Sequence, residues 1–169
     1  MSENNPILQV KDLTVSFNAF AGKVQAVRGV SFDLNKGETL CIVGESGSGK
    51  SVTNKAIMGI LSKNAVIDRG EILYDGMDLT KLTEEQFCQI RGKRIAMVFQ
   101  DPLSALNPIM KVGKQITETL CVHQKLSHEQ AKKRALELMA AVGIPEPEKR
   151  FNQYPFQFSG VMRQRIVIV

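Results

Sequence analysis

The sequence lacks the cysteine patterns that define several classes of small protein. Its three cysteines, Cys41, Cys88 and Cys121, are an odd number and include no C-x-x-C pair. A zinc ribbon and a disulfide framework are therefore not expected. Cys41 lies within an apolar run, where we expect a small buried hydrophobic side chain, and this favours a reducing, cytosolic setting.

Targeting and membrane signals are also missing. The opening residues, MSENNPILQV, contain neither a basic region nor an apolar core, so no secretory signal is expected. No apolar run approaches the ~20 residues that span a bilayer. Internal repeats and low-complexity tracts are absent as well. Any role at a membrane is therefore expected to act through partner proteins.

The charge is positive but not concentrated. Lysine and arginine exceed aspartate and glutamate by 22 to 17, a net charge of +5. The densest basic run, Lys132 to Arg134, is interpreted as a solvated helix face, so no nucleic-acid partner is predicted. A hydrophobic fraction of 43% in 169 residues is ordinary for a globular domain with a real core.

The hydrophobic pattern predicts strands mainly in the first hundred residues. We expect strands at residues 7–17, 24–34, 38–43, 70–74 and 94–99. Gly29 interrupts the second of these, and Asp75-Gly76 is a turn signal after the fourth. The runs at 38–43 (ETLCIV) and 94–99 (RIAMVF) are nearly continuous, which is typical of strands buried on both faces.

Helical spacing and capping signals predict helices elsewhere. We expect them at residues 50–61, 112–124 and 127–142, and after Thr83. Thr83 with Gln86, and Ser127 with Gln130, form capping boxes, and Gly143 ends the third helix. The order predicts an α/β core at 1–101 with an antiparallel part, a helical subdomain at 102–160, and the start of another helix at 161–169. Residues 166–169 (IVIV) are predicted to be a β-prone tail.

Residues 44–51, GESGSGKS, fit the pattern G-x-x-x-x-G-K-[ST] between a predicted strand and a predicted helix. Glycines let successive backbone N–H groups converge on phosphate, and the following helix adds its positive end. Lys50 is expected to reach the β- and γ-phosphates of ATP, and Ser51 to ligate Mg²⁺. The predicted nucleotide-binding residues are Gly44, Glu45, Ser46, Gly47, Ser48, Gly49, Lys50, Ser51 and Val52.

This cradle does not name the reaction, because kinases, GTPases and ATP-driven motors all use one. Hydrolysis also requires a carboxylate that orients water, normally at the end of another apolar strand. After residue 100, no run of four apolar residues is followed by aspartate or glutamate. A kinase is disfavoured by the segment Phe158–Arg165 described next.

Two further segments resemble a known family. Gln100-Asp101-Pro102, after RIAMVF, resembles the Q-loop of ABC-type ATPases, and Phe158–Arg165 (FSGVMRQR) resembles their signature motif. The wording AVRGVSFDL, IRGKRIAMVFQDPLSALNP and YPFQFSG is similar to ATPase subunits of oligopeptide, dipeptide and nickel importers. The resemblance covers residues 6–169 and implies an incomplete ABC-type P-loop nucleotide-binding domain with a mixed sheet core and a helical subdomain insert.

The resemblance also implies site residues beyond the cradle. Gln100 would ligate Mg²⁺ and sense the γ-phosphate, so it joins Lys50 as a catalytic candidate. Phe17, or failing that Phe20, would stack on adenine; a plain core aromatic is the alternative for Phe17. In a head-to-tail pair of subunits, the signature residues Ser159, Gly160 and Val161 would face the partner's ATP.

The implied function is ATP-driven peptide uptake at the cytoplasmic face of the plasma membrane. The implied partners are a second ATPase subunit, two transmembrane permease subunits and, indirectly, a peptide-binding protein. The substrate, whether peptide, dipeptide or nickel, stays open. An ABC-type ATPase of DNA repair is disfavoured, because zinc-binding cysteines and long coiled coils are missing near Gln100.

This sequence departs from the family pattern in two places. Val161 replaces the second glycine of the signature, and its β-branched side chain is predicted to weaken the sandwich and hydrolysis. The family continues past the signature helix with a strand ending in Asp-Glu and a histidine switch, which these 169 residues do not contain. We therefore expect this chain alone to be hydrolysis-deficient. The alternative is a non-catalytic nucleotide-binding or docking fragment.

Overall fold

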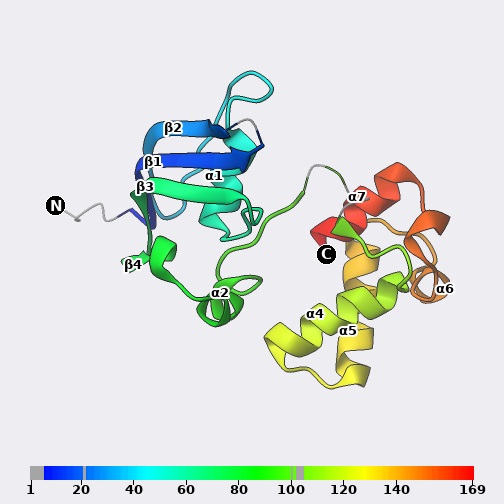
Figure 1. Ribbon diagram of the computed structural model, residues 1–169. Coiled ribbons are helices and arrows are strands. Elements are labelled where there is room, and N and C mark those ends of the chain that lie inside the picture. Colours follow the sequence, from blue (N-terminus) through cyan, green and yellow to red (C-terminus); the bar gives the residue numbers. More distant parts are fainter. Residues whose placement is uncertain (1–5, 21, 100, 102–104) are drawn as a thin grey trace. The chain divides into compact units, whose positions relative to one another are not determined.

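The computed structural model describes residues 6–20, 22–99, 101 and 105–169 (Figure 1). It forms two compact units, Met1–Arg91 and Gly92–Val169. The first unit is rich in strands and the second is helical. The structural division falls at Arg91, ten residues before the boundary proposed from sequence, and residues 161–169 belong to the second unit.

The first unit is built on an antiparallel sheet of four strands in the order β2-β1-β3-β4 (Figure 1). The strands are β1 (Leu8–Ala19), β2 (Gly22–Leu34), β3 (Ala65–Tyr74) and β4 (Met77–Asp78). The three predicted strands in these regions are confirmed, and β3 begins five residues earlier than expected. Their alternating apolar residues supply the core, with Val10, Leu13, Val15, Val27 and Ile72 almost fully buried.

Gly29 does not end its strand. The register of β1 against β2 shifts between Leu13 and its neighbours, and Gly29 adopts a φ of +67° inside β2. A Cβ on Gly29 would lie 2.9 Å from Oδ1 of Asp12, so the glycine permits a close approach of the two strands. The sequence interruption is thus an irregularity within a continuous strand.

A polar contact joins the three long strands. Ser16 of β1 is fully buried, and its hydroxyl donates a hydrogen bond to Oδ2 of Asp68 on β3. Lys23 of β2 forms an ion pair with Oδ1 of the same carboxylate. The hydrogen bond from Lys23, with that from Ser16, holds the pKa of Asp68 below its ordinary value.

We expect Asp68→Asn to lower stability near neutral pH and to have little effect in acid. Because the folded-state pKa is lowered, the stabilisation is fully present above the unfolded pKa of about 3.9 and is lost as pH falls through the lower folded value. Urea denaturation of both proteins from neutral pH down to about pH 2 measures this. Asp33→Asn, an exposed carboxylate on β2, is the control. A stability gap that stays constant with pH would contradict the expectation.

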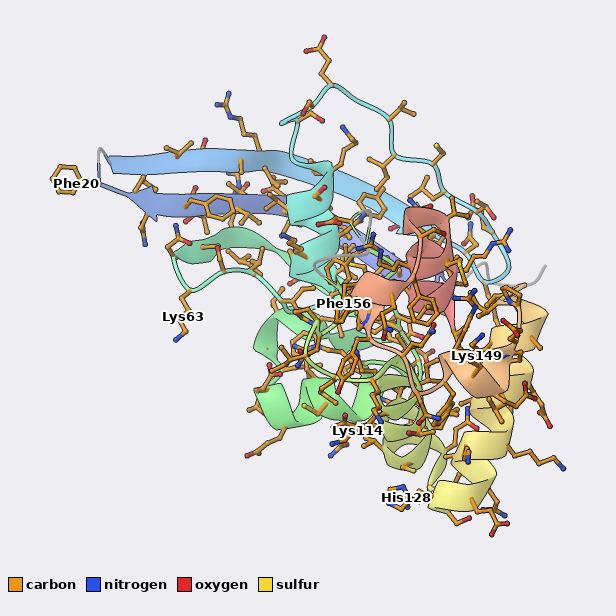
Figure 2. The ribbon with its side chains drawn as sticks, turned by 90° about the vertical axis from the view of Figure 1, so that its right-hand side faces the viewer. Phe20, Lys63, Lys114, His128, Lys149 and Phe156 are labelled. Atoms are coloured by element: carbon orange, nitrogen blue, oxygen red, sulfur yellow. The ribbon has the colours of Figure 1, made fainter. Side chains whose placement is uncertain are left out.

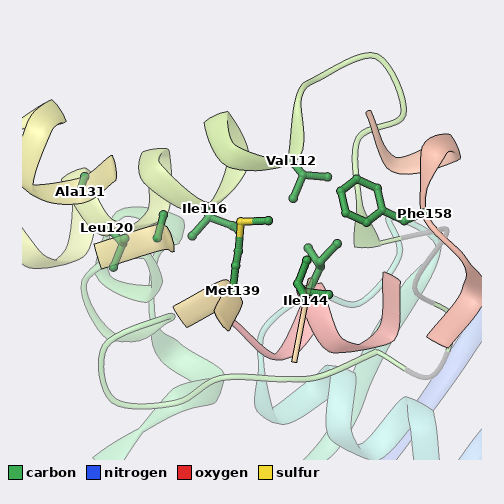
Figure 3. Close-up of a cluster of buried hydrophobic side chains, with 9 residues drawn as sticks. Val112, Ile116, Leu120, Ala131, Met139, Ile144 and Phe158 are labelled. Atoms are coloured by element: carbon green, nitrogen blue, oxygen red, sulfur yellow. The ribbon is translucent and has the colours of Figure 1, made fainter. Parts of the chain in front are cut away.

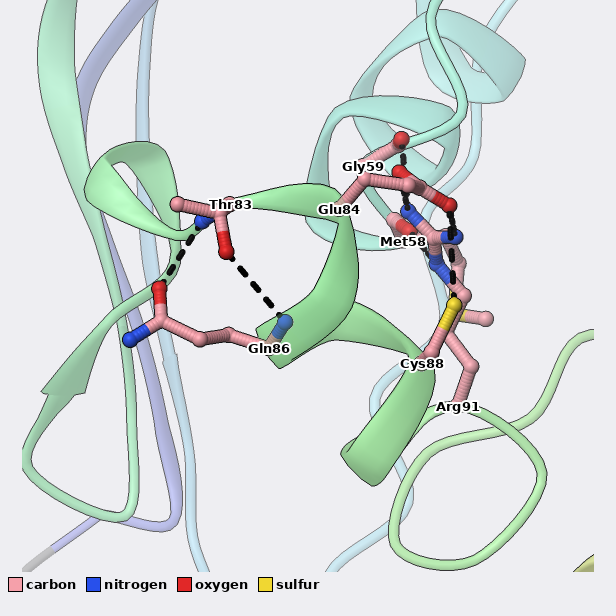
Figure 4. Close-up of polar contacts among 7 residues, drawn as sticks. All are labelled: Met58, Gly59, Thr83, Glu84, Gln86, Cys88 and Arg91. Carbon is pink, nitrogen blue, oxygen red and sulfur yellow. Dashed lines mark hydrogen bonds and ion pairs between the residues drawn. The ribbon is translucent and has the colours of Figure 1, made fainter.

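Short helices complete the first unit. They are α1 (Lys50–Ile57), the 3₁₀ turn η1 (Leu79–Lys81) and α2 (Glu84–Ile90). The predicted capping box is confirmed: Gln86 N–H donates to Oγ1 of Thr83 at 3.4 Å, and Thr83 N–H to Oε1 of Gln86 at 2.9 Å (Figure 4). Helix α1 is shorter than the predicted 50–61, because Gly59 (φ +63°) turns the chain after Met58.

Two predicted strands are not formed. Residues 38–43 have no strand structure, and Val43 is 87% exposed. Residues 96–99 likewise have none, and Val98 is 61% exposed. Cys41 is exposed, so its predicted burial is wrong, and the inference of a reducing setting loses this support. An apolar run becomes a buried strand only where neighbouring strands satisfy both edges, and no strand of the described residues pairs with either run.

The second unit packs helices around one hydrophobic core (Figure 3). Its elements are α4 (Val112–Gln124), α5 (His128–Ala141), α6 (Pro147–Arg150), η2 (Pro155–Gln157) and α7 (Gly160–Ile168). The buried cluster contains Val112, Ile116, Leu120, Ala131, Ala135, Met139, Ile144, Phe158 and Ile166. The helices predicted at 112–124 and 127–142 are therefore confirmed, including the Ser127–Gln130 capping box and the stop at Gly143 (φ +73°).

The predicted β-prone tail at residues 166–169 is wrong. Residues up to Ile168 continue helix α7, and Ile166 is buried in the core of the second unit. Ser159 caps this helix, accepting a hydrogen bond from Met162 N–H at 3.3 Å. Packing and the cap override the β-propensity of isoleucine and valine.

Candidate functional site

The loop at residues 44–49 is packed tightly against strand β2. Gly49 is the N-cap of α1 with a φ of +92°, and a Cβ there would lie 2.5 Å from the carbonyl oxygen of Ala26. Gly47 has a φ of +83°, and a Cβ on Gly44 would lie 2.8 Å from Oγ of Ser48. Each of the three glycines is therefore required for a different reason. A residue with a Cβ at Gly44, Gly47 or Gly49 would strain the loop.

Lys50 folds back over this loop. Its Nζ donates hydrogen bonds to the carbonyl oxygens of Gly44 at 2.6 Å and Glu45 at 2.7 Å, and to Oγ of Ser48 at 3.2 Å. All three donors of the ammonium group are thus directed at oxygens of the loop. The positive charge lies where the sequence pattern requires it, beside the backbone that would surround a phosphate.

The first turn of helix α1 is fixed to the end of the loop by hydrogen bonds to Gly49. Thr53 is buried, its N–H donates to the carbonyl of Gly49 at 2.8 Å, and its hydroxyl donates to the same oxygen at 3.1 Å. Ser51 is exposed in the first turn, and that turn contains no acidic residue. The positive end of the helix dipole and the Ser51 hydroxyl are therefore available to an anion with its Mg²⁺.

The structure places residues of strand β2 beside the loop, which the sequence pattern did not predict. A hollow of about 340 Å³ is lined by residues of β2 together with two loop residues: Gln25, Ala26, Val27, Arg28, Val30, Gly47 and Ser48. This volume lies in the range of small-molecule sites. Only the fold brings residues 25–30 beside residues 47–48, and no local pattern in the sequence signals it.

The remaining predicted site residues are not gathered at this loop. Phe17 is half-buried on β1, where it pairs with Val24 and Ala65, and it does not line the hollow. Phe20 projects into solvent beyond the end of β1 (Figure 2). The adenine-stacking role of Phe17 stays a prediction, and Gln100 lies outside the described residues.

The signature-like residues lie in the second unit, at the start of α7. Ser159 is its N-cap, Gly160 is its first residue, and a Cβ on Gly160 would meet nothing within 4 Å. Val161 is 60% exposed. These side chains make an accessible helix start, which is what contact with another molecule would require.

The antiparallel sheet, the glycine loop and the helix that begins at its lysine define a P-loop nucleotide-binding domain of α/β class. The comparison with protein families makes this more specific. The family described as ABC transporter matches residues 27–169. The chain belongs to this family.

The most informative relatives are peptide-transport proteins. The chain is 61% identical over 163 residues to the oligopeptide transport ATP-binding protein OppD of Bacillus subtilis, covering 96% of this chain and 46% of the relative. It is 57% identical over 163 residues to the dipeptide transport ATP-binding protein DppD of Lactococcus lactis, covering 96% and 47%. The chain thus spans about half the length of these curated relatives.

Solved structures show the same fold. A dimeric ATP-binding cassette in a post-hydrolysis state, bound to ADP and Pi, matches with a TM-score of 0.82 and 27% identity, covering 95% of this chain and 67% of that one. The protein cbiO1 of Clostridium perfringens, part of the ABC transporter complex cbiONQ, matches with a TM-score of 0.68 and 25% identity, covering 97% and 60%. Among the described residues, no helix has the length and apolar character needed to cross a membrane.

Proposed function

We propose that this chain is the nucleotide-binding part of an ABC importer ATPase subunit that couples ATP binding and hydrolysis to peptide uptake. The observation that carries the proposal is the tight loop of residues 44–49 with the Lys50 ammonium held over it. The 61% identity to an oligopeptide transport protein favours peptides as the transported class.

The loop and its helix would hold ATP with Mg²⁺. Backbone N–H groups of residues 44–51 would bind the phosphates, Lys50 would contact the β- and γ-phosphates, and Ser51 would ligate the metal, with Gln100 as its second protein ligand. The hollow along β2 would receive the sugar or base, within reach of Gln25 and Arg28. Phe17 is proposed to stack on adenine.

The remaining partners follow from the family. A second ATPase subunit would meet Ser159, Gly160 and Val161 at the exposed start of α7, since a cassette similar to this chain is dimeric. Two permease subunits would anchor the protein to the cytoplasmic face of the plasma membrane. A peptide-binding protein would deliver the substrate. The chain's own membrane contact would therefore be indirect.

A second candidate is a nucleotide-binding or docking subunit without hydrolytic activity. Val161 favours it, because a β-branched side chain stands where the signature resemblance calls for glycine. We propose that the 169-residue chain binds Mg·ATP but hydrolyses it only weakly.

Calorimetric titration of the purified chain with Mg·ATP, together with a phosphate-release assay, tests both candidates. We expect one binding site per chain and phosphate release near background. A chain that is folded by circular dichroism but does not bind Mg·ATP would contradict the nucleotide-binding function. Sustained phosphate release would contradict the second candidate and favour the first, a hydrolysing ATPase subunit.

We expect Val161→Gly to raise ATP turnover several-fold in a chimera where residues 1–169 replace the matching part of the Bacillus subtilis relative. Glycine would remove a Cβ from the face that approaches the partner's γ-phosphate. Gln164→Gly, at an exposed position of the same helix, is the matched control, because it changes helix propensity alone. Equal turnover of the valine and glycine chimeras would contradict the expectation.

A further inference from the structure

Arg91, the last residue of the first unit, binds the end of the helix that carries Lys50. Its Nε donates to the carbonyl oxygen of Met58 at 2.8 Å, and its Nη2 donates to that of Gly59 at 2.9 Å (Figure 4). These carbonyls follow the last turn of α1. The guanidinium group therefore caps the C-terminal end of the helix, and its side chain is only 20% exposed.

The end of α1 has few other partners. Gly59 N–H bonds to the carbonyl of Ala56 at 3.0 Å, and Ile60 N–H to that of Lys55 at 2.9 Å, which closes the helix by a left-handed turn. The carbonyls of Met58 and Gly59 point onward, where a cation is favoured by the negative end of the helix dipole. Arg91 meets both requirements with one planar group.

Arg91 is itself held in place by α2. Its Nη1 contacts Oε1 of Glu84 at 2.5 Å and its Nη2 contacts Oε2 at 3.1 Å, a two-pronged pair that keeps the pKa of Glu84 below its ordinary value. The guanidinium carbon also lies 4.6 Å from the ring centre of Phe87. A Cβ on Gly59 would lie 2.5 Å from that ring, so α2 abuts the end of α1 directly.

Helix α1 has two turns, about 12 Å from end to end. Lys50 and Ser51 stand in its first turn, and its buried residues are only Thr53 and Ala56. Such a short helix with a small buried face is weakly fixed by packing alone. A restraint at its far end therefore limits tilting and sliding, which would move Lys50 relative to the loop.

We propose that Arg91 is a positioning residue of the nucleotide site: it fixes α1 from its C-terminal end and thereby holds Lys50 and Ser51 in register with the phosphate loop. This inference rests on the proposed nucleotide-binding function. It assigns no contact between Arg91 and the nucleotide. Glu84 and Phe87 act by holding the guanidinium group in its planar position.

Calorimetric titration with Mg·ATP separates positioning from simple loss of fold. Arg91→Gln is expected to weaken Mg·ATP binding about tenfold, the effect if displacement of α1 costs the nucleotide roughly one hydrogen bond to a charged group, while the number of sites per chain stays at the wild-type value. Arg91→Lys keeps the positive charge but not the fork, so its affinity is expected to be intermediate. Arg134→Gln, which breaks an exposed ion pair on α5, is the matched control and is expected to change neither quantity.

Amide hydrogen exchange tests the same inference without nucleotide. Arg91→Gln is expected to speed exchange of the α1 amides at Thr53 to Ile57 at least several-fold, while exchange in β1 stays unchanged. Unchanged exchange in α1 overturns the inference whether or not nucleotide binds. A fall in the number of Mg·ATP sites per chain at constant affinity also overturns the inference, because it would mean that Arg91 only keeps the chain folded. Failure of the unsubstituted chain to bind Mg·ATP overturns the proposed function instead.

Discussion

Replacing Lys50 by alanine is expected to weaken Mg·ATP binding by about 10- to 150-fold, the range for losing a charged hydrogen-bonding partner of phosphate. The effect should be large because the ammonium is already fixed by three loop oxygens, two of them backbone carbonyls 2.6 and 2.7 Å away. When the lysine meets an anion, hydrogen bonds to these oxygens are exchanged for charge-assisted bonds to phosphate, which alanine cannot make. The helix dipole and the loop N–H groups remain in the variant, so binding should weaken rather than vanish.

Calorimetry with Mg·ATP measures this change, and Lys55→Ala provides the control. Lys55 is exposed on the same helix, about one and a half turns from the loop. Its replacement by alanine removes the same charge as Lys50→Ala. We expect Lys55→Ala to alter affinity less than about threefold, because charge beyond the first turn contributes little. If both variants bind equally well, the loop is not the phosphate site.

Replacing Gly49 by alanine is expected to produce a large loss of stability in the first unit. A left-handed backbone costs a residue with a Cβ about 1–2 kcal/mol. The new Cβ would also lie 2.5 Å from the Ala26 carbonyl oxygen, a contact that forces the loop away from β2. Overpacking of this kind adds about 1–3 kcal/mol. The free energy of unfolding should fall by roughly 2–5 kcal/mol in total.

Urea denaturation of Gly49→Ala beside Gly37→Ala distinguishes the two contributions. Gly37 has a φ of +80° in a turn, and a Cβ there would meet nothing within 4 Å. It therefore reports backbone strain alone, expected to be about 1 kcal/mol. Equal losses in the two variants would mean that the contact between loop and strand is not rigid. The hollow between β2 and the loop would then not be a fixed binding site.

The sequence predicted elements best where local chemistry decides them. The capping boxes at Thr83 and Ser127 and the helix stop at Gly143 were correct, because each depends on residues within four positions of one another. The strands around Leu13 and Ile72 were also found. Their alternating pattern predicts which face of each strand is buried, but it does not predict which strand pairs with which.

The errors have a common cause. Residues 38–43 and 94–99 carry the composition of buried strands, yet such runs need neighbours along both edges, and composition cannot supply them. Residues 166–169 carry β-propensity, yet Ser159 begins a helix that runs through them and Ile166 reaches the core. In each case a long-range or upstream interaction outweighs the local preference.

For the candidate site, the sequence alone predicted the glycine loop. The positions of its glycines, Lys50 and Ser51 follow from a contiguous pattern whose chemistry is local to the backbone. Only the tertiary structure revealed what surrounds it: the β2 wall of Gln25 and Arg28, and the Arg91 cap at the far end of α1. These groups come from positions some 20 to 40 residues away along the chain. Sheet pairing and helix packing bring the β2 residues to the loop and Arg91 to the far end of α1, and no spacing within the sequence encodes these contacts.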